Sequence, residues 1–462
     1  MRKPGEIVRI GCGASSWGDD VGEPREILTR ARLDYLMMDY LAEVTMSIMR
    51  RQMDRDPRSG FASDFVTVIK DILPLIAESG TKVVTNAGGL NPVGCGEAIV
   101  ALIKAAGYED RIRVAVVDGD DLLPQIGELA KSHPLTSGDD GRKFAEIHDR
   151  VLSANAYLGA RPIRAALDHG AHIVITGRCV DVALTLGPLL YEFDWADDDW
   201  DRIASGVVAG HLLECGPQAT GGNYHGWQDV EGLEHVGYPI VEVDGDGVVI
   251  LTKADSTGGV VNCATATEQL LHEISDPKAF LSPDAIVDWT SIRLEDLGND
   301  RVRLTGMRGA PPPSTMKLSI TYRDGYRAVL MWPYAWPDAR LKGEAAIRKI
   351  EHTIARLGLR LEATRADIFG TGAIHGARIR AAGLDGTGDD SDPPEVFVRF
   401  AARSAHREDI ERLAAQQAPM HKGPPGLAGH LAGGRGQVTP IYSHWPTLIP
   451  ANCVSARIQI LH

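Results

Sequence analysis

The chain has 462 residues, of which 44% are hydrophobic and 24% are charged, and its formal net charge is −14. This length exceeds that of one ordinary hydrophobic core, so we expect two domains. No apolar run approaches the ~20 residues that a transmembrane helix needs, and the acidic balance disfavours nucleic acid and acidic membranes as partners. Because the N-terminus lacks a signal-peptide pattern and the six cysteines lack metal-like spacing, we expect a cytoplasmic protein with reduced thiols.

The first half of the chain alternates strand-like and helical segments, which is typical of a parallel α/β sheet. Strands are expected at residues 7–11, 34–40, 82–86, 113–119, 151–159 and 172–177. We predict that residues 1–222 form an α/β domain with a mostly parallel, open, Rossmann-like sheet. A barrel is the alternative, because six such units fit the beginning of either fold.

From about residue 237 the pattern becomes rich in strands. "YPIVEVDGDGVVILTK" indicates a hairpin over an Asp-Gly turn, and helical patterns at residues 343–358 and 407–417 would cover one face of a sheet. We therefore predict that residues 223–462 form an α+β domain on a mixed or antiparallel sheet, with a glycine-rich loop at residues 421–445.

The segment "KVVTNAGGLNPVG", residues 82–94, joins a strand to a helix through two adjacent glycines. Asn91 is a good N-cap, and the free N–H groups of a helix start attract anions. Gly88 and Gly89 would let a phosphate, carboxylate or thioester oxygen approach the backbone closely. We take both glycines, with Asn86 and Asn91, as substrate-binding candidates; a tight turn that needs positive φ is the alternative.

Acidic residues follow the second and fourth expected strands, and ligands of α/β sheets bind beyond such strand ends. We take Asp39, Glu43 and Asp118 as candidates for general acid and base catalysis. Mg²⁺ takes one or two carboxylates plus waters, so a magnesium site between Asp118 and Asp39 is another possible role.

The sixth expected strand ends in "TGRCVD", residues 176–181. Arg178 could bind a carboxylate or phosphate, with Thr176 and Gly177 beside it and Asp181, expected in the first helical turn, holding it in place. The alternative is an Arg–Asp pair that only locks the turn.

The segment "HLLECGPQATGG" places Cys215, Gly221 and Gly222 near the expected domain junction, where ligand sites are common. Cys215 is a candidate nucleophile if His211 lowers its pKa, and a buried inert thiol is the alternative. Gly221 and Gly222 are substrate-binding candidates.

The loop "GCGASSWG" after the first strand supplies two further substrate-binding candidates, Gly11 and Gly13. It lacks the full G-x-G-x-x-G spacing, so it gives little support for a dinucleotide site. A plain β-to-α turn is the alternative.

Six blocks in this order resemble the acyclic terpene utilisation family AtuA: "TNAGGLNP", "VVDGDDLL", "ANAYLGARPI", "IVITGRCVDVALTLGP", "HLLECGPQATGG" and "TKADSTGGVVN". The resemblance covers nearly the whole chain. It implies a role in the catabolism of acyclic terpenes and of branched acids handled as coenzyme A thioesters. It brings no agreed catalytic residues, so the candidates above come from the residues alone.

The resemblance and the strand-end residues together favour a lyase that acts on an acyl-CoA, either hydratase-like or cleaving a C–C bond. Coenzyme A would then enter as part of the substrate, with no other cofactor expected unless Mg²⁺ takes part. A homo-oligomer is expected. Longer relatives carry an extra C-terminal domain, so a separate small protein partner is also expected. The alternatives are a non-catalytic subunit that binds a thioester or a partner, and a metal-dependent hydrolase.

Overall fold

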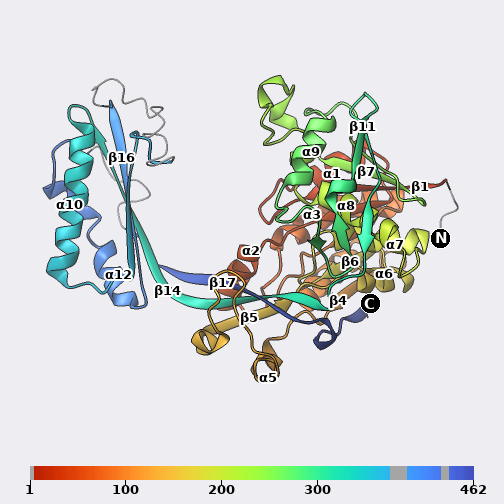
Figure 1. The fold of residues 1–462 in the computed structure, drawn as a ribbon, viewed down its shortest axis with the longest axis horizontal. Helices are drawn as coiled ribbons and strands as arrows, with labels where there is room; N and C mark the ends of the chain where they lie inside the picture. Colours follow the sequence, from red (N-terminus) through yellow and green to blue (C-terminus); the bar gives the residue numbers. More distant parts are fainter. Residues whose placement is uncertain (1–4, 375–392, 428–435) are drawn as a thin grey trace. The chain divides into compact units, whose positions relative to one another are not determined.

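A computed structural model describes residues 5–374, 393–427 and 436–462 of the chain (Figure 1). The chain divides into two compact units, one of Met1–Tyr322 with His444–His462 and the other of Arg323–Ser443. β14 (Thr315–Ala335) and β17 (Thr439–Pro450) contribute residues to both. The glycine-rich loop expected at residues 421–445 lies partly outside the described residues, and its last part belongs to β17.

Five parallel strands form the centre of the ten-stranded sheet of the first unit, in the order β1-β2-β3-β6-β4. They are β1 (Ile7–Ala14), β2 (Tyr35–Met38), β3 (Lys82–Thr85), β4 (Val114–Asp118) and β6 (Ile173–Thr176). Because β2 and β6 are buried along their whole length, protein must cover both faces of the sheet. The predicted α/β fold is confirmed, and the carboxyl ends of the five strands share one edge.

Antiparallel strands extend this sheet on both sides. The predicted hairpin forms as β7 (Pro239–Asp244) and β8 (Val249–Lys253), but β7 pairs with β1 and continues the first sheet. Beyond it lie β12 (Val302–Thr305) and β11 (Arg293–Asp296), and β18 (Arg457–Leu461) pairs with β4 on the other side. The boundary expected between residues 222 and 223 thus falls inside the first unit, because a hairpin signal is local and does not indicate which sheet the hairpin joins.

The expected strand at residues 151–159 does not belong to the parallel sheet, so this part of the prediction is wrong. It forms β5 (Val151–Ala156), which pairs antiparallel with β14. Its apolar side chains, with Leu318 and Ile320 of β14, pack in a separate small core around Trp445. This pairing places Lys317 next to Tyr157, whose backbone N–H donates to the Lys317 carbonyl at 3.0 Å.

Helices pack against the sheet in two groups. One group is α1 (Glu23–Arg30), α3 (Ser63–Ser79) and α4 (Pro92–Ala106), and the other is α6 (Arg161–Asp168), α7 (Ala183–Phe193) and α8 (Trp200–Glu214). The unit also contains α2 (Glu43–Met53), α5 (Ile126–Ser132), α9 (Cys263–Leu271), β9 (Phe280–Leu281), β10 (Ile286–Asp288) and β13 (Arg308–Ala310). α3 and α4 end at Gly80 and Gly107, whose φ values of 76° and 73° suit the left-handed cap that a glycine allows.

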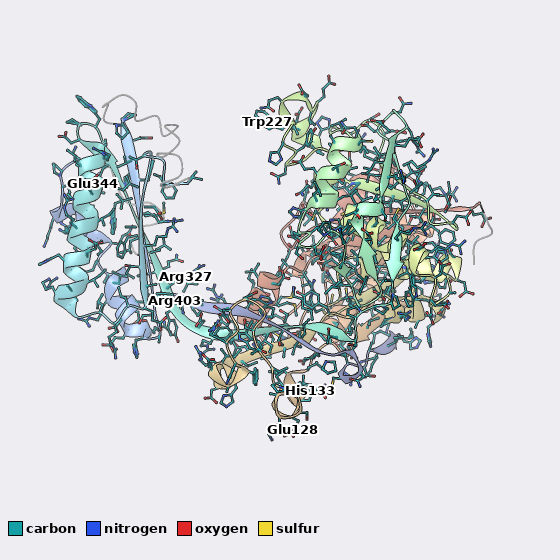
Figure 2. The ribbon with its side chains drawn as sticks, viewed as in Figure 1. Glu128, His133, Trp227, Arg327, Glu344 and Arg403 are labelled. Atoms are coloured by element: carbon teal, nitrogen blue, oxygen red, sulfur yellow. The ribbon has the colours of Figure 1, made fainter. Side chains whose placement is uncertain are left out.

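The second unit is an antiparallel sheet in the order β15-β16-β14-β17, with β15 (Ala363–Phe369) and β16 (Glu395–Ser404). α10 (Ala339–Leu357) and α12 (Arg407–Ala414) both pack on β16, over a core that includes Trp332 and Phe400. Arg327 and Arg403, labelled in Figure 2, are cross-strand neighbours of β14 and β16. The predicted α+β arrangement of helices on an antiparallel sheet is confirmed. In neither unit does a helix that the structure describes have the length and hydrophobicity to cross a bilayer.

Candidate active site

A cavity of about 330 Å³ in the first unit, which we call the inner cavity, combines charged and apolar walls. This volume suits a small-molecule ligand. Its walls come from the segments that follow β2, β5 and β6, from the end of α8 and from the start of β14. The ionisable lining residues are Glu43, Tyr157, Asp181, His211, Glu214, Glu273 and Lys317, and the apolar ones are Val180, Val182, Phe280, Leu281, Pro283, Pro313, Met316 and Leu448.

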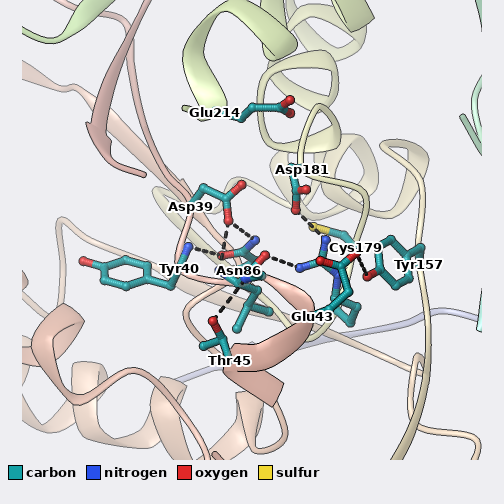
Figure 3. Close-up of polar contacts among 12 residues, drawn as sticks. Asp39, Tyr40, Glu43, Thr45, Asn86, Tyr157, Cys179, Asp181 and Glu214 are labelled. Atoms are coloured by element: carbon teal, nitrogen blue, oxygen red, sulfur yellow. Dashed lines mark hydrogen bonds and ion pairs between the residues drawn. The ribbon is translucent and has the colours of Figure 1, made fainter. Parts of the chain in front are cut away.

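Asp39 follows β2, and its side chain is held in place by hydrogen bonds (Figure 3). One carboxylate oxygen accepts from Asn86 Nδ2 at 2.7 Å and from the backbone N–H of Leu41 at 3.0 Å. Asn86, which follows β3, accepts in turn from the backbone N–H of Tyr40 at 2.7 Å. Burial raises the pKa of Asp39 to about 6, although Arg178 and these hydrogen bonds act to lower it.

Arg178 follows β6 and is only 1% exposed, so its charge must be satisfied by protein. Its Nη2 donates to Asp181 at 2.6 Å, its Nη1 donates to the Leu41 carbonyl, and its guanidinium carbon lies 4.1 Å from the centre of the Tyr157 ring. The Arg178–Asp181 contact expected from the sequence is present. Asp181, however, lies two residues before α7 rather than in its first turn.

Tyr157 and Lys317 connect this buried cation to Glu43 at the start of α2. The Tyr157 hydroxyl donates to Glu43 Oε1 at 3.1 Å, and Lys317 Nζ donates to the same oxygen at 2.8 Å. Lys317 Nζ also lies 4.7 Å from the centre of the Tyr157 ring. The Lys317 side chain is 40% exposed, so its ammonium group remains accessible to a ligand in the inner cavity.

Two of the four carboxyl groups that line the inner cavity, Asp181 and Glu43, have pKa values shifted in opposite directions. Burial raises the pKa of Asp181 well above its usual range, and the nearby charges of Asp39 and Glu214 add to this, although Arg178 opposes it. For Glu43, burial also acts to raise the pKa, but the hydrogen bond and charge of Lys317 outweigh it and hold the pKa at about 2. Environments that separate two carboxyl groups in this way are typical of acid and base pairs in active sites.

His211 does not activate Cys215. Its Nε2 donates to the Gln269 carbonyl at 2.9 Å, and its Nδ1 lies 2.6 Å from a carboxylate oxygen of Glu214, a partner that outweighs burial and raises the His211 pKa. Burial, together with the charge of Glu214, raises the pKa of the Cys215 thiol to about 12. The geometry therefore favours the inert thiol, the alternative considered for Cys215.

Asp118 is the last residue of β4, the strand that pairs with β18, and it does not line the inner cavity. Its carboxylate accepts from Arg457 Nε at 2.8 Å and from Gln459 Nε2 at 2.7 Å. The Asp118 carboxylate therefore binds these two β18 side chains, and it does not share a site with Asp39. Within the described ranges, no group of three or more His, Cys, Asp or Glu side chains has the geometry to hold a metal ion.

In the loop "NAGGLNP", other protein atoms occupy the space beside the two glycines. A Cβ on Gly88 would lie 2.5 Å from the Thr176 carbonyl oxygen, and Gly89 has a φ of +51° and lies against Met49. Asn91 caps α4 by accepting from the Gly94 N–H at 3.0 Å, as predicted, and its Nδ2 donates to the Arg58 and Ser59 carbonyls in the loop between α2 and α3. These contacts favour the tight turn over a ligand cradle.

The remaining predicted glycines also lie against protein atoms. A Cβ on Gly11 would meet Leu33, one on Gly13 would meet Leu36, and one on Gly177 would meet the carboxylate of Asp120. Thr176 is fully buried, and its hydroxyl donates to the Gly177 carbonyl at 2.8 Å. Gly221 and Gly222 pack against Val260 and Pro217 in the turn after α8.

Among the predicted site residues, Glu43 lines the inner cavity, Asp39 and Asn86 are buried and hydrogen-bonded to each other, and the buried Arg178 donates to the cavity residue Asp181. Lys317 was not predicted. It reaches the cavity through the pairing of β14 with β5, which joins residues more than 150 positions apart, and no local pattern indicates such a pairing.

Comparison with protein families identifies one match, to the model described as acyclic terpene utilisation family protein AtuA, over residues 8–460. No functionally curated protein matches the sequence. Because the family model spans nearly the whole chain, both compact units are part of the family's architecture. The chain therefore belongs to the acyclic terpene utilisation family AtuA, and this membership implies a role in the use of acyclic terpenes.

Proposed function

We propose that the protein is a lyase that acts on a branched acyl thioester bound in the inner cavity. The observation that carries this proposal is that a carboxyl group with a raised pKa, Asp181, and an ammonium group, Lys317, line one cavity that also has apolar walls. The apolar walls suit a branched hydrocarbon chain, and the family's role in acyclic terpene utilisation supports a terpene-derived substrate.

Cleavage of a 3-hydroxyacyl thioester needs a proton shuttle and a stabiliser of negative charge. A carboxylate takes the hydroxyl proton, the C2–C3 bond breaks to leave a carbonyl at C3, and its electron pair enters the thioester as an enolate that is then protonated at C2. Asp181 would serve both proton steps: its carboxylate, which accepts a hydrogen bond from Arg178, takes the hydroxyl proton, and its raised pKa makes it a stronger base than an ordinary carboxylate. Lys317 would stabilise the enolate oxygen.

Residues around Asp181 and Lys317 have supporting roles. Arg178 holds the Asp181 carboxyl group by a hydrogen bond at 2.6 Å, and the charge of Asp39 raises the Asp181 pKa. Glu43 holds Lys317 and Tyr157 in position through a shared oxygen. In this scheme Asp181 replaces Asp39 and Asp118 as the acid–base residue.

Turnover followed by mass spectrometry tests this proposal, with branched 3-hydroxyacyl-CoA thioesters as substrates. Asp181→Asn should lower kcat by about 100-fold or more, the usual contribution of a general acid–base group. Asp168→Asn is the matched control, because Asp168 pairs with Arg164 on an exposed part of α6 and should leave kcat unchanged. Full activity of Asp181→Asn would refute the assignment, and binding without turnover by the wild type would favour a non-catalytic binding subunit.

A further inference from the structure

A second and larger depression of about 780 Å³, which we call the outer groove, adjoins the inner cavity. The two share three lining residues, Glu43, Lys317 and Leu448. Leu448 is an exposed apolar residue at this junction, with 60% of its surface accessible. A ligand that extends from the inner cavity past Lys317 would therefore enter the outer groove.

The walls of the outer groove are fixed by packing. On β17, Trp445 is buried and packs against Phe144, and its neighbours His444, Pro446, Thr447 and Leu448 line the groove. The opposite wall is the loop at residues 134–139, whose Gly138 N–H donates to the Pro446 carbonyl at 2.8 Å. This cross-link holds the two walls of the groove together.

His444 gives the groove an unused hydrogen-bonding group. Its Nε2 is shielded from water and has no hydrogen-bond partner among the residues that the structure describes. Burial lowers its pKa, and the charges of Glu43 and Lys317 act on it in opposite directions, so the ring is neutral near pH 7. A buried polar atom without a partner costs free energy, and a ligand's amide or carbonyl group can recover it once the His444 ring turns Nε2 toward the groove.

The charges of the groove select against phosphate. Its cation Lys317 is paired with Glu43, and Asp139 adds a further negative charge. A polyphosphate or nucleotide would need a surplus of cations here. Uncharged polar groups fit better, since Thr136, Ser137 and Thr447 line the groove beside His444.

We propose that the outer groove binds the uncharged, amide-bearing arm of the substrate, a pantetheine-like chain, while the acyl part occupies the inner cavity. This inference rests on the proposed thioester function. The scissile end of the acyl chain then lies next to Lys317, at the junction of the two. The nucleotide part of a coenzyme A ester contributes little to binding, because the groove offers it no free cation among the described lining residues.

Isothermal titration calorimetry with three thioesters of one branched acid tests the proposal. We use the S-methyl ester, the pantetheine ester and the coenzyme A ester. The pantetheine ester should bind about ten-fold or more tightly than the S-methyl ester, as one or two net hydrogen bonds provide. The coenzyme A ester should bind within about three-fold of the pantetheine ester.

Two variants locate the effect in the outer groove. Gly138→Phe adds bulk at a position where a Cβ has room, its nearest neighbour being 3.7 Å away, and His444→Ala removes the unpartnered nitrogen. Both substitutions should lower the affinity for the pantetheine ester to about that for the S-methyl ester, and the affinity for the S-methyl ester should not change.

Two results would overturn the proposal. The wild type could bind both esters with equal affinity, or both variants could keep the wild-type ratio of the two affinities. If the wild type binds the S-methyl ester alone, the outer groove is refuted and the inner cavity stands; if it binds none of the three, the thioester function fails as well.

Discussion

Two strand-end loops of the first unit lie on neighbouring parallel strands, yet they differ in what they contact. The loop after β3, residues 86–91, is rich in glycine and closes on protein atoms. The loop after β6 carries Arg178 and Asp181 and forms a wall of the inner cavity. The comparison teaches that the adjacent glycines of one loop serve close packing of the backbone, whereas the Arg178–Asp181 pair of the other lies at the wall of a cavity.

The largest expected loss of stability follows a substitution in the loop after β6. Arg178→Met removes the partner of Asp181 and leaves buried carboxyl groups without compensation, so we expect the free energy of unfolding to fall by about 3–5 kcal/mol. Urea denaturation at pH 7.5 measures it. Arg25→Met is the control, because Arg25 and Asp71 form a pair with exposed side chains, so that this substitution should lower the free energy of unfolding far less. Similar losses for the two variants would contradict the distinction.

The second effect is on the pH dependence of stability. The pKa of Asp39 is raised from 3.8 to about 6 in the folded state, so the folded state binds more protons than the unfolded state between these values. The contribution of Asp39 to the free energy of unfolding therefore rises as pH falls from about 7 to about 4. Asp39→Asn removes it, and the difference between wild type and variant should change by roughly 2–3 kcal/mol across this window. A difference that is independent of pH would show that Asp39 does not titrate as described.

The third and smallest expected loss of stability follows a substitution in the loop after β3. Gly88→Ala places a methyl group 2.5 Å from the Thr176 carbonyl oxygen, and the rearrangement should lower the free energy of unfolding by about 1–3 kcal/mol. Gly127→Ala is the matched control, since its Cβ meets nothing within 4 Å and lies in α5, where alanine should be neutral or stabilising. A Gly88→Ala protein of unchanged stability that fails to bind thioester would instead make this loop a ligand cradle.

Local sequence signals predicted the elements of the fold but not all of their partners. Buried apolar runs and turn residues located β1, β2, β3, β4 and β6, and Asn91 was correctly read as the N-cap of α4. The pairing of β5 with β14, and of β7 with β1, depends on contacts between distant segments, which no local pattern specifies.

The same division applies to the candidate site. Arg178 and Asp181 are three residues apart, so their contact could be predicted from the sequence. Lys317 could not, because it meets Glu43 only after a long-range strand pairing. The role given to Cys215 depended on His211, whose nitrogens are both occupied by other groups in the folded chain.

The most direct test of the account is a thermal shift of the purified protein with a branched acyl-CoA thioester, free coenzyme A and the matching free acid. A ligand at about 100 times its dissociation constant adds roughly 2.7 kcal/mol to the free energy of unfolding, which is readily measured. We predict that the thioester raises the Tm, that free coenzyme A has little effect, and that Lys317→Met weakens the shift. An unchanged Tm with every branched thioester would contradict the claim that the inner cavity is a thioester site.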